Sequence, residues 1–303
     1  MRVTVTGATG LIGSKVVEEL LARGDDVTVL TRSLESARDR LAQGVRAVAW
    51  DPESDIAPAA ALDGCDGVVH LAGENVAQRW TKAAKQRILA SRERGTRNLV
   101  AGIAAASPRP AVLVSSSAVG YYGPHGDELL DEETPPGDDF LAEVVKVWER
   151  EADAVTRLGV RLVKLRTGVV LDSSGGALAK MLPFFKAGIG GPVAGGRQYM
   201  PWLHVRDVAG MVLRALDDEA WSGPINAATP DPVTNAALSK ALGRALGRPA
   251  LAPVPALAVQ LLYGEMAEMV TKGQRVIPRR ALELGYEFRH PDLDEALHDT
   301  LRR

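Results

Sequence analysis

Three glycines near the N-terminus have the spacing of a turn that binds nucleotide phosphates. They lie in the segment Gly7-Ala8-Thr9-Gly10-Leu11-Ile12-Gly13, which directly follows the strand-like run Arg2–Thr6. In such a turn Gly7 allows the tight bend, Gly10 lets the backbone approach a pyrophosphate, and Gly13 allows close packing of helix on strand. Backbone N–H groups at the start of the next helix would then hold the phosphates. We therefore predict a dinucleotide site formed by Gly7, Thr9, Gly10, Leu11, Ile12 and Gly13, with a ligand-free turn as the alternative.

The end of the second strand-like run indicates which dinucleotide is bound. When the ribose 2′-OH is unmodified, an acidic residue usually stands about twenty residues after the glycine turn. This chain has Thr31-Arg32-Ser33 there, and an arginine beside hydroxyls suits a 2′-phosphate. We therefore predict NADP(H) as the cofactor, held by Thr31, Arg32 and Ser33, unless Arg32 is only a solvated charge. Asp51, after the third run, could hold the adenine edge or simply form a turn before Pro52.

Short apolar runs alternate with amphipathic stretches, which predicts repeated strand–helix units and an α/β fold with a doubly wound parallel sheet of the Rossmann type. The expected strands are Arg2–Thr6, Val27–Leu30, Val45–Trp50, Gly67–Leu71, Ala111–Ser115 and Arg161–Leu165. The first helix, from Leu11 to Arg23, should end at Gly24, because glycine suits the left-handed residue that follows a helix. Ligands of such a sheet bind beyond the carboxyl ends of its strands.

The pattern changes after about residue 171, where glycine-rich loops and a segment that mixes proline with leucine and methionine begin. We predict that residues 1–170 form the NADP-binding domain, with returns to its sheet near residues 204–229. Residues 171–203 and 230–303 are then expected to form a smaller, mostly helical substrate lobe.

Composition excludes several classes of function. The formal net charge is -2, with 36 cationic and 38 anionic side chains, so neither nucleic acid nor an anionic membrane is an expected partner. Cys65 is the only cysteine and the five histidines include no His-x-x-x-His pair, so we predict no metal site. The apolar stretch 250–263 is too short to span a membrane, and the N-terminus does not resemble a signal peptide. We expect a cytoplasmic protein with a small-molecule substrate, and we leave a homodimer open.

Several motifs resemble those of the extended short-chain dehydrogenase/reductase superfamily, which includes nucleotide-sugar epimerases. They are Gly7–Gly13, the strand end His70-Leu71-Ala72-Gly73 and the helical segment Gly95-Thr96-Arg97-Asn98-Leu99. Four further segments resemble an NAD(P)-dependent epimerase-family branch whose C-terminal segment is a domain of unknown function: His70–Trp80, Ser115–Gly123, Pro201–Val208, and Gly273–Arg280 with Gly285–Phe288. The resemblance spans the chain and implies the fold and the cofactor more strongly than the substrate.

The resemblance also implies a catalytic set of Ser or Thr, Tyr and Lys, in which the phenol exchanges a proton with the substrate oxygen. Ser117 and Lys146 match the first and last members. A Tyr-x-x-x-Lys pair would place the tyrosine at position 142, but that residue is Ala142. Either Tyr121 or Tyr122, on the loop after Ser117, could supply the phenol, or both could be walls of the pocket.

Further residues are assigned by their positions in the resemblance. Those expected to contact the cofactor are Leu71, Ala72, Gly73, Glu74, Arg92, Ser115, Lys146 and Arg166. A solvated helix charge is the alternative for Arg92. Gln198, Trp202 and His204 should lie on the substrate side, although a lone histidine such as His204 is more often a packed residue than a catalyst.

Together these features predict an NADP(H)-dependent oxidoreductase or epimerase acting on a small hydroxyl- or carbonyl-bearing substrate, with a nucleotide-linked sugar as one candidate. The missing tyrosine supports an alternative from another class, a non-catalytic NADPH-binding protein that reports the state of the cofactor. Ser117 and Lys146 argue against that alternative.

Overall fold

The computed structural model describes residues 1–302, and its centre is a seven-stranded sheet in which every strand pairing is parallel. In spatial order the strands are β11 (Gly223–Ala227), β7 (Arg161–Thr167), β5 (Val112–Ala118), β4 (Gly67–His70), β1 (Arg2–Thr6), β2 (Asp26–Thr31) and β3 (Arg46–Ala49). The doubly wound α/β fold expected from the sequence is therefore confirmed. β3 is shorter than predicted, whereas β5 and β7 run further, so Ser117 and Arg166 lie within strands.

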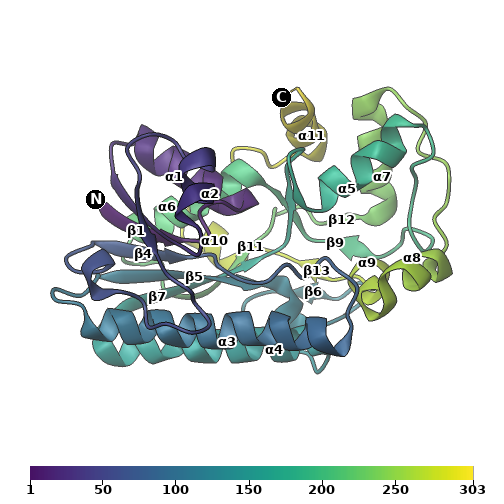
Figure 1. Cartoon of the computed structure of the whole chain (residues 1–303). Helices are drawn as coiled ribbons and strands as arrows, with labels where there is room; N and C mark the ends of the chain where they lie inside the picture. The colour runs from purple at the N-terminus through teal and green to yellow at the C-terminus, as the bar shows by residue number, and fades with distance from the viewer. Residues whose placement is uncertain (303) are drawn as a thin grey trace.

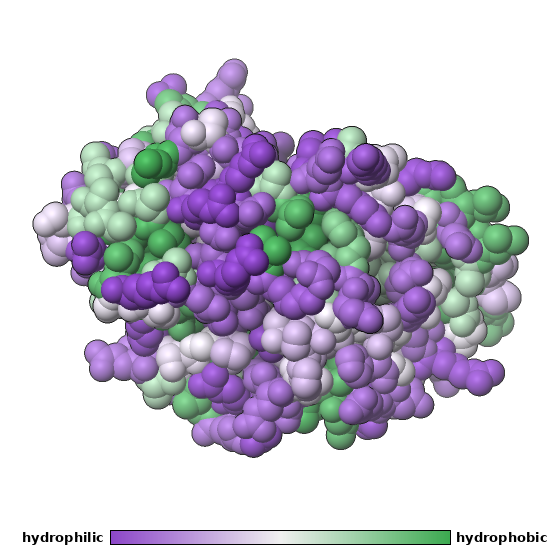
Figure 2. Space-filling model, turned by 90° about the horizontal axis from the view of Figure 1, so that it is seen from below, coloured by the Kyte–Doolittle hydropathy of each residue, from purple (hydrophilic) through white to green (hydrophobic). Residues whose placement is uncertain are grey.

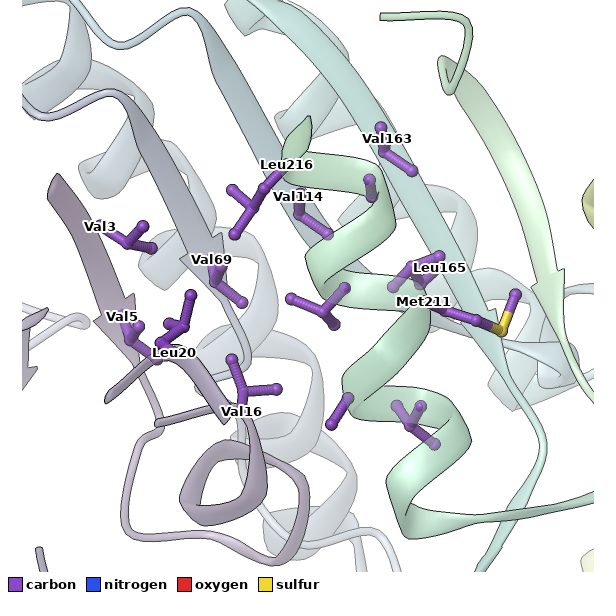
Figure 3. Packing of buried hydrophobic residues seen from close by; sticks show 14 of the residues in the cluster. Val3, Val5, Val16, Leu20, Val69, Val114, Val163, Leu165, Met211 and Leu216 are labelled. Carbon is purple, nitrogen blue, oxygen red and sulfur yellow. The ribbon is translucent and has the colours of Figure 1, made fainter. Parts of the chain in front are cut away.

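Helices cover both faces of the sheet (Figure 1). One face carries α1 (Leu11–Ala22) and α6 (Val205–Asp217), and the other carries α3 (Lys82–Ala105) and α4 (Phe140–Asp153). Figure 3 shows side chains of α1 and α6, such as Leu20 and Met211, packed against strand valines. Full burial of each such side chain stabilises the fold by about 1.5–3 kcal/mol. As predicted, Gly24 follows the end of α1 in a left-handed conformation, with φ of 85°.

The order of the strands reverses between β1 and β4. From β1 the chain continues outward to β2 and β3, and from β4 it continues the other way to β5, β7 and β11. A crevice opens beyond the carboxyl ends of the strands at such a reversal. The glycine turn follows β1 and the segment beginning at Leu71 follows β4, so both lie at this crevice.

The remaining elements are two-stranded sheets and further helices. They are α2 (Leu34–Arg40), β6 (Leu129–Leu130), β8 (Val169–Leu171), α5 (Gly176–Lys186), β9 (Tyr199–Met200), β10 (Trp202–His204), β12 (Val233–Thr234), α7 (Asn235–Leu246), α8 (Ala256–Tyr263), α9 (Glu268–Thr271), β13 (Arg275–Val276), α10 (Arg279–Glu283) and α11 (Leu293–Leu301). Of these helices, α2 contacts β3 and α10 contacts β11. Short 3-10 turns occur at η1 (Ala59–Ala61), η2 (Val119–Tyr122), η3 (Ala154–Leu158) and η4 (Gly264–Ala267). Buried side chains of α5, α7 and α11, among them Leu182, Leu242 and Leu297, share a separate core.

The chain leaves the main sheet after β7 and returns to it with α6 and β11, so the last strand pairs with β7 only after this excursion. The division into a domain and a lobe at the predicted residues remains a prediction.

The helix α8 exposes several apolar side chains. Leu257, Leu261 and Leu262 of α8 are each about two-thirds exposed. Seen from below in Figure 2, green residues gather at the right edge of the molecule, where α8 lies in Figure 1. No helix within residues 1–302 is long and apolar enough to cross a membrane.

Candidate functional site

The glycine turn after β1 leaves no room for side chains at two of its three glycines. Gly7 has φ of 70°, and a Cβ there would lie 2.7 Å from the carbonyl carbon of Leu71. A Cβ at Gly13 would lie 2.2 Å from the carbonyl oxygen of Gly7. The turn closes with a 3.0 Å hydrogen bond from Gly10 N to Gly7 O. The chain therefore needs glycine at both positions to bring β1, α1 and the segment that follows β4 (Leu71–Glu74, called the β4 exit) together.

A pocket of about 240 Å³ opens above this turn. Its walls come from the turn, from the ends of β2 and β3, and from the segment after β4. They comprise Gly7, Ala8, Thr9, Gly10, Val29, Leu30, Thr31, Arg32, Trp50, Pro52, Glu53, Leu71, Ala72, Gly73, Glu74 and Ser91. The structure thus brings together nine of the residues expected at the cofactor: Gly7, Thr9, Gly10, Thr31, Arg32, Leu71, Ala72, Gly73 and Glu74.

Other expected cofactor residues lie outside these walls. Leu11, Ile12 and Gly13 form the first turn of α1. Ser33 caps α2, because its hydroxyl accepts a hydrogen bond from Ser36 N at 3.2 Å. Asp51 is exposed and accepts from Glu53 N at 3.1 Å, so it acts as the turn-former that was the alternative reading.

Arg92 lies directly behind the pocket wall. Its Nη1 donates to the carbonyl oxygens of Glu74 at 3.0 Å and Ile88 at 3.2 Å. A Cβ at Gly73 would lie 3.3 Å from its Cζ. Burial lowers the pKa of Arg92 to about 10, although the charge of Glu74 opposes this shift. Arg92 therefore supports the wall from behind, and the solvated-charge alternative does not describe it.

A buried hydrogen-bonded chain holds the β4 exit in place. Thr6 Oγ1 accepts from Leu71 N and Ala72 N, both at 3.2 Å, and lies 2.8 Å from His70 Nδ1. His70 Nε2 lies 3.0 Å from Thr96 Oγ1. Burial, aided by the charge of Arg92, lowers the pKa of His70 to about 4, so the ring is neutral at physiological pH. The sequence motifs did not predict that Thr6 holds the residues after β4. Its position directly before Gly7, at the end of β1, is the signal that could have indicated this role.

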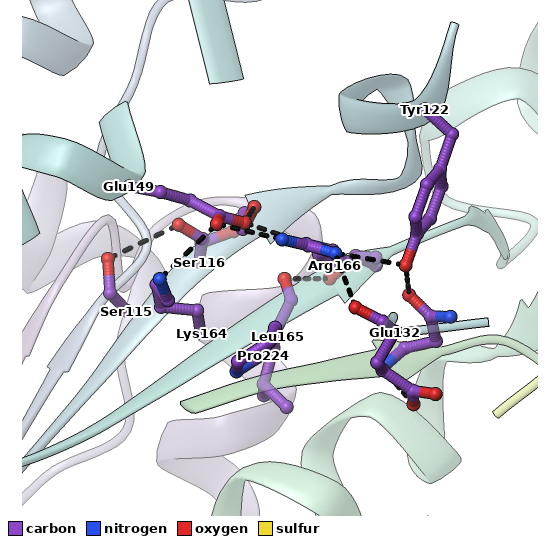
Figure 4. Close-up of polar contacts among 12 residues, drawn as sticks. Ser115, Ser116, Tyr122, Glu132, Glu149, Lys164, Leu165, Arg166 and Pro224 are labelled. Carbon is purple, nitrogen blue, oxygen red and sulfur yellow. Dashed lines mark hydrogen bonds and ion pairs between the residues drawn. The ribbon is translucent and has the colours of Figure 1, made fainter. Parts of the chain in front are cut away.

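The candidate catalytic serine, Ser117, belongs to a buried ionic network. Figure 4 shows Glu149 and Arg166, the charged pair at the centre of this network. Ser117 Oγ donates to Glu149 Oε1 at 2.7 Å. The two oxygens of Glu149 also accept from Arg166 Nε at 2.9 Å and Nη2 at 3.0 Å. Glu149 and Arg166 are both almost fully buried. Ser117 and Arg166 therefore share Glu149 as a partner, and neither of them lines the pocket. Ser115 is also buried, and its hydroxyl donates to Ser116 O.

The two adjacent tyrosines occupy different environments. Tyr122 is fully buried, donates to Asn226 Oδ1 at 2.7 Å and accepts from Arg166 Nη1 at 3.1 Å. Burial raises the pKa of Tyr122 to about 12 despite the nearby Arg166. The Tyr121 ring stacks on the Arg166 guanidinium at 3.5 Å, and its hydroxyl makes no hydrogen bond within residues 1–302. Of the two phenols, only that of Tyr121 has no hydrogen-bond partner within residues 1–302, and neither tyrosine is among the residues that line the pocket.

The helix that carries position 142 and Lys146 is α4, and it is capped by Asp139, whose side chain accepts from Ala142 N at 2.8 Å. Lys146 pairs with Glu143 and lies 3.4 Å from Gly137 O, with a side chain that is one-third exposed. Ala142 is fully buried, so the helix packing at that position has no space for a phenol. Lys146 is not among the residues that form the pocket walls.

Sequence reasoning missed the acidic members of the ionic network, Glu149 and Glu132. Glu132 accepts from Asn226 N at 2.9 Å, and the side chain of the same Asn226 accepts from the Tyr122 hydroxyl. Glu149 lies on α4 among the buried side chains of Val145, Trp148 and Ala152. A carboxylate that interrupts an apolar helix stripe is a readable signal of a buried ion pair.

Comparison with known proteins agrees with this architecture. Residues 3–228 match the NAD dependent epimerase/dehydratase family, and residues 254–300 match a domain of unknown function (DUF1731). The Arabidopsis thaliana protein "Epimerase family protein SDR39U1 homolog, chloroplastic" is 41% identical over 305 residues, covering 100% of this chain and 87% of that protein. The Bacillus subtilis "Epimerase family protein YfhF" is 35% identical over 302 residues, covering 99% and 98%.

Solved structures show the same similarity. The crystal structure of "human epimerase family protein SDR39U1 (isoform2) with NADPH" is similar with a TM-score of 0.88 and 37% identity, over 100% of both chains. A UDP-N-acetylglucosamine 4-epimerase from Bacillus cereus shares the fold, with a TM-score of 0.78 and 20% identity over 99% of this chain and 98% of that one. The family match, the relatives and the glycine turn agree with one another, and the chain belongs to the NAD dependent epimerase/dehydratase family, in a branch that carries the C-terminal domain of unknown function.

Proposed function

We propose that this chain binds NADP(H) in the pocket at the β1–β4 crevice and is an NADP(H)-dependent oxidoreductase or epimerase of a small hydroxyl- or carbonyl-bearing substrate. The observation that carries the proposal is the pocket, in which the glycine-containing turn Gly7–Gly10 and an exposed arginine, Arg32, face the same space. The human relative crystallised with NADPH supports the choice of cofactor. Location in the cytoplasm and formation of a homodimer remain predictions from the sequence.

The residues of the pocket fit the parts of this cofactor. Gly10 and the start of α1 would hold the pyrophosphate, because a backbone without Cβ atoms and with N–H groups at a helix start suits an anion. Thr31 and Arg32 would hold the adenosine end, and Leu71 to Glu74 the nicotinamide end. Bound NADPH supplies a hydride to a carbonyl carbon, and the chain must supply the proton.

The cofactor preference can be tested at Arg32. Arg32→Ala should weaken NADPH binding by about 1.5–3 kcal/mol, or roughly 10- to 150-fold, because it removes a charge-assisted hydrogen bond to the 2′-phosphate. NADH binding should change little, since NADH lacks that phosphate. Isothermal titration of both cofactors would measure the change. Arg38→Ala, an exposed arginine on α2, is the matched control and should leave both affinities unaltered. Equal affinity of the unmodified chain for NADPH and NADH would refute the assignment.

We further propose that Tyr121 replaces the phenol that Ala142 cannot supply. Tyr121→Phe should lower the rate of NADPH oxidation by a carbonyl substrate about 100-fold or more, as expected for loss of a general acid. Tyr122→Phe should instead lower stability by about 1–3 kcal/mol, because Asn226 and Arg166 each lose a buried partner. The assay is NADPH absorbance against a panel of aldehydes, ketones and nucleotide sugars. A Tyr121→Phe chain with unchanged turnover would remove Tyr121 from the mechanism.

A second function is supported by a specific observation. Ser117 is bound to Glu149 in a buried network and position 142 is a packed alanine, so the catalytic set of the superfamily is not assembled. Those features suit a protein that binds NADPH and reports its presence without turnover. Stoichiometric NADPH binding with no oxidation by any member of the carbonyl panel would favour this function.

A further inference from the structure

A second group of polar side chains gathers away from the cofactor pocket, where α6 begins beside α11 and the segment before it. His204, Asp207 and His290 each offer a ligand atom, and these atoms lie within 4.8 Å of one another. None of the three lines the cofactor pocket. His204 and Asp207 lie at the start of α6, whereas His290 lies between α10 and α11, so the group joins parts of the chain that are distant in sequence.

Asp207 is a fully buried carboxylate at the centre of this group. Its Oδ1 accepts from Arg289 N at 2.6 Å and its Oδ2 accepts from His290 N at 3.1 Å. His290 Nδ1 lies 3.4 Å from the same Oδ2, is buried, and makes no hydrogen bond. A ring nitrogen that faces a buried carboxylate oxygen at this distance is stable only with a proton or a cation between them, because two lone pairs otherwise repel.

The two imidazole rings are oriented alike. They stack with centroids 3.9 Å apart and a tilt of 35°. Their Nε2 atoms both face Asp299 Oδ2, at 3.3 Å for His204 and 3.9 Å for His290. His204 Nδ1 accepts a hydrogen bond from Arg206 N at 3.3 Å, in the first turn of α6, the turn that also carries Asp207. Both Nδ1 atoms are therefore on the Asp207 side and both Nε2 atoms on the Asp299 side.

This is the arrangement of metal-binding histidines in proteins, which coordinate through one ring nitrogen and donate the other N–H to a carboxylate. Two imidazoles with one carboxylate suit Zn²⁺ best among the common biological cations. Bonds of about 2.0–2.2 Å place the ligand atoms of Zn²⁺ about 3–4 Å apart, so the group must close by roughly 1 Å. The 3.3 Å hydrogen bond that His204 Nδ1 accepts from Arg206 N, which caps α6, would be exchanged for the ion.

We propose that His204 Nδ1, His290 Nδ1 and Asp207 Oδ2 bind one divalent transition-metal ion, Zn²⁺ by preference, with Asp299 accepting both Nε2–H groups. A water molecule would complete the tetrahedron. The ion ties the start of α6, which packs on the main sheet, to the C-terminal segment that leads into α11. We infer a structural role from this link between distant segments: His204 and Asp207 are buried, and the side chain of His290 is 18% exposed, which leaves access for the water. His204 and Asp207 are three residues apart, but His290 lies 83 residues beyond Asp207, so no local residue pattern predicts this metal site.

The test is Zn²⁺ binding by the full chain after dialysis against a chelator. Isothermal titration should find one equivalent of Zn²⁺ per chain, and Zn²⁺ should raise the midpoint of thermal unfolding. His290→Gln should weaken binding at least tenfold and abolish the thermal shift. The matched control is His298→Gln, because His298 is an exposed histidine on α11 beside Asp299 and should change neither result. Equal Zn²⁺ binding by His290→Gln and the unmodified chain would overturn the proposal.

A spectroscopic measurement keeps the proposal testable even if His290→Gln does not fold. Co²⁺ added to the unmodified chain should produce the visible absorption of a tetrahedral nitrogen–oxygen site at one equivalent, and Zn²⁺ should displace it. Asp299→Asn should retain that stoichiometry with weaker affinity, because an amide still orients the rings but carries no charge. Absence of the Co²⁺ absorption in the unmodified chain would also overturn the proposal.

Discussion

Glu149→Gln is expected to lower the free energy of unfolding by about 3–5 kcal/mol, because it leaves the buried Arg166 guanidinium without its carboxylate. The side chains of Glu149 and Arg166 are only 7% and 4% exposed. Removing a single partner of such a pair is costly, since the remaining charge has neither water nor a counterion. Urea unfolding followed by circular dichroism would measure the loss.

Two further variants isolate the effect of burial. Glu143→Gln removes a carboxylate from the same helix, but Glu143 is 58% exposed and pairs with Lys146 at the surface. That change should cost less than about 1 kcal/mol. Replacing both partners, Glu149→Leu with Arg166→Met, should recover much of the stability lost in the single variant. If Glu149→Gln proves no worse than Glu143→Gln, the network does not stabilise the fold as we infer.

The same pair predicts a dependence on pH. Burial alone would raise the pKa of Glu149, but the hydrogen bonds and charge of Arg166 outweigh it and hold that pKa below its ordinary value of 4.5. Because the folded pKa is depressed, the stabilisation is present above pH 4.5 and is lost as the pH falls through the folded value. The difference in stability between the unmodified chain and Glu149→Gln should therefore narrow below pH 4.5.

The second large effect is expected at Gly13. Gly13→Ala should abolish NADPH binding and destabilise the chain by about 3 kcal/mol or more, because the new Cβ would lie 2.2 Å from Gly7 O and force α1 away from β1. Both the phosphate turn and the packing of α1 depend on that approach. Thermal unfolding and cofactor titration on the same sample would record the two losses together.

Gly10→Ala is the matched comparison within the same turn. Its Cβ would meet only Gly7 O, at 3.2 Å, and Gly10 has an ordinary negative φ of -82°. We expect this variant to fold with little loss of stability but to bind NADPH at least tenfold more weakly, because its methyl group would occupy the approach of the pyrophosphate. A Gly13→Ala chain that keeps its stability and its NADPH affinity would show that the turn tolerates a side chain.

The sheet and the phosphate turn could be predicted because each depends on local pattern. Buried parallel strands appear as short apolar runs, and the glycines of the turn are required by contacts within a few residues of one another or with the adjacent strand. The left-handed conformation of Gly24 after α1 could also be predicted, because it depends only on the local end of the helix. Strand ends were less accurate: β5 continues through Ser117 because hydrogen bonds to β7, not side-chain hydrophobicity, set its length.

The polar core of the site could not be predicted in the same way. Glu149, Arg166, Tyr122 and Asn226 come from four different elements, so no spacing along the chain relates them. The sequence suggested that either Tyr121 or Tyr122 could donate a proton, and only the environment of each hydroxyl separates them. Arg166, expected at the cofactor, is instead committed to the carboxylate on α4.

The late return of β11 to the sheet bears on how the chain is made. Ribosomes add roughly 5–20 residues per second, so several seconds pass between the synthesis of β7, which ends at Thr167, and that of β11, which starts at Gly223. During that interval we expect the emerging polypeptide to display β7 with one row of amide and carbonyl groups unpaired, on a strand that contains the apolar residues Val163 and Leu165. An open strand edge of this kind is where neighbouring nascent chains join one another, so slow translation through residues 168–222 should favour aggregation.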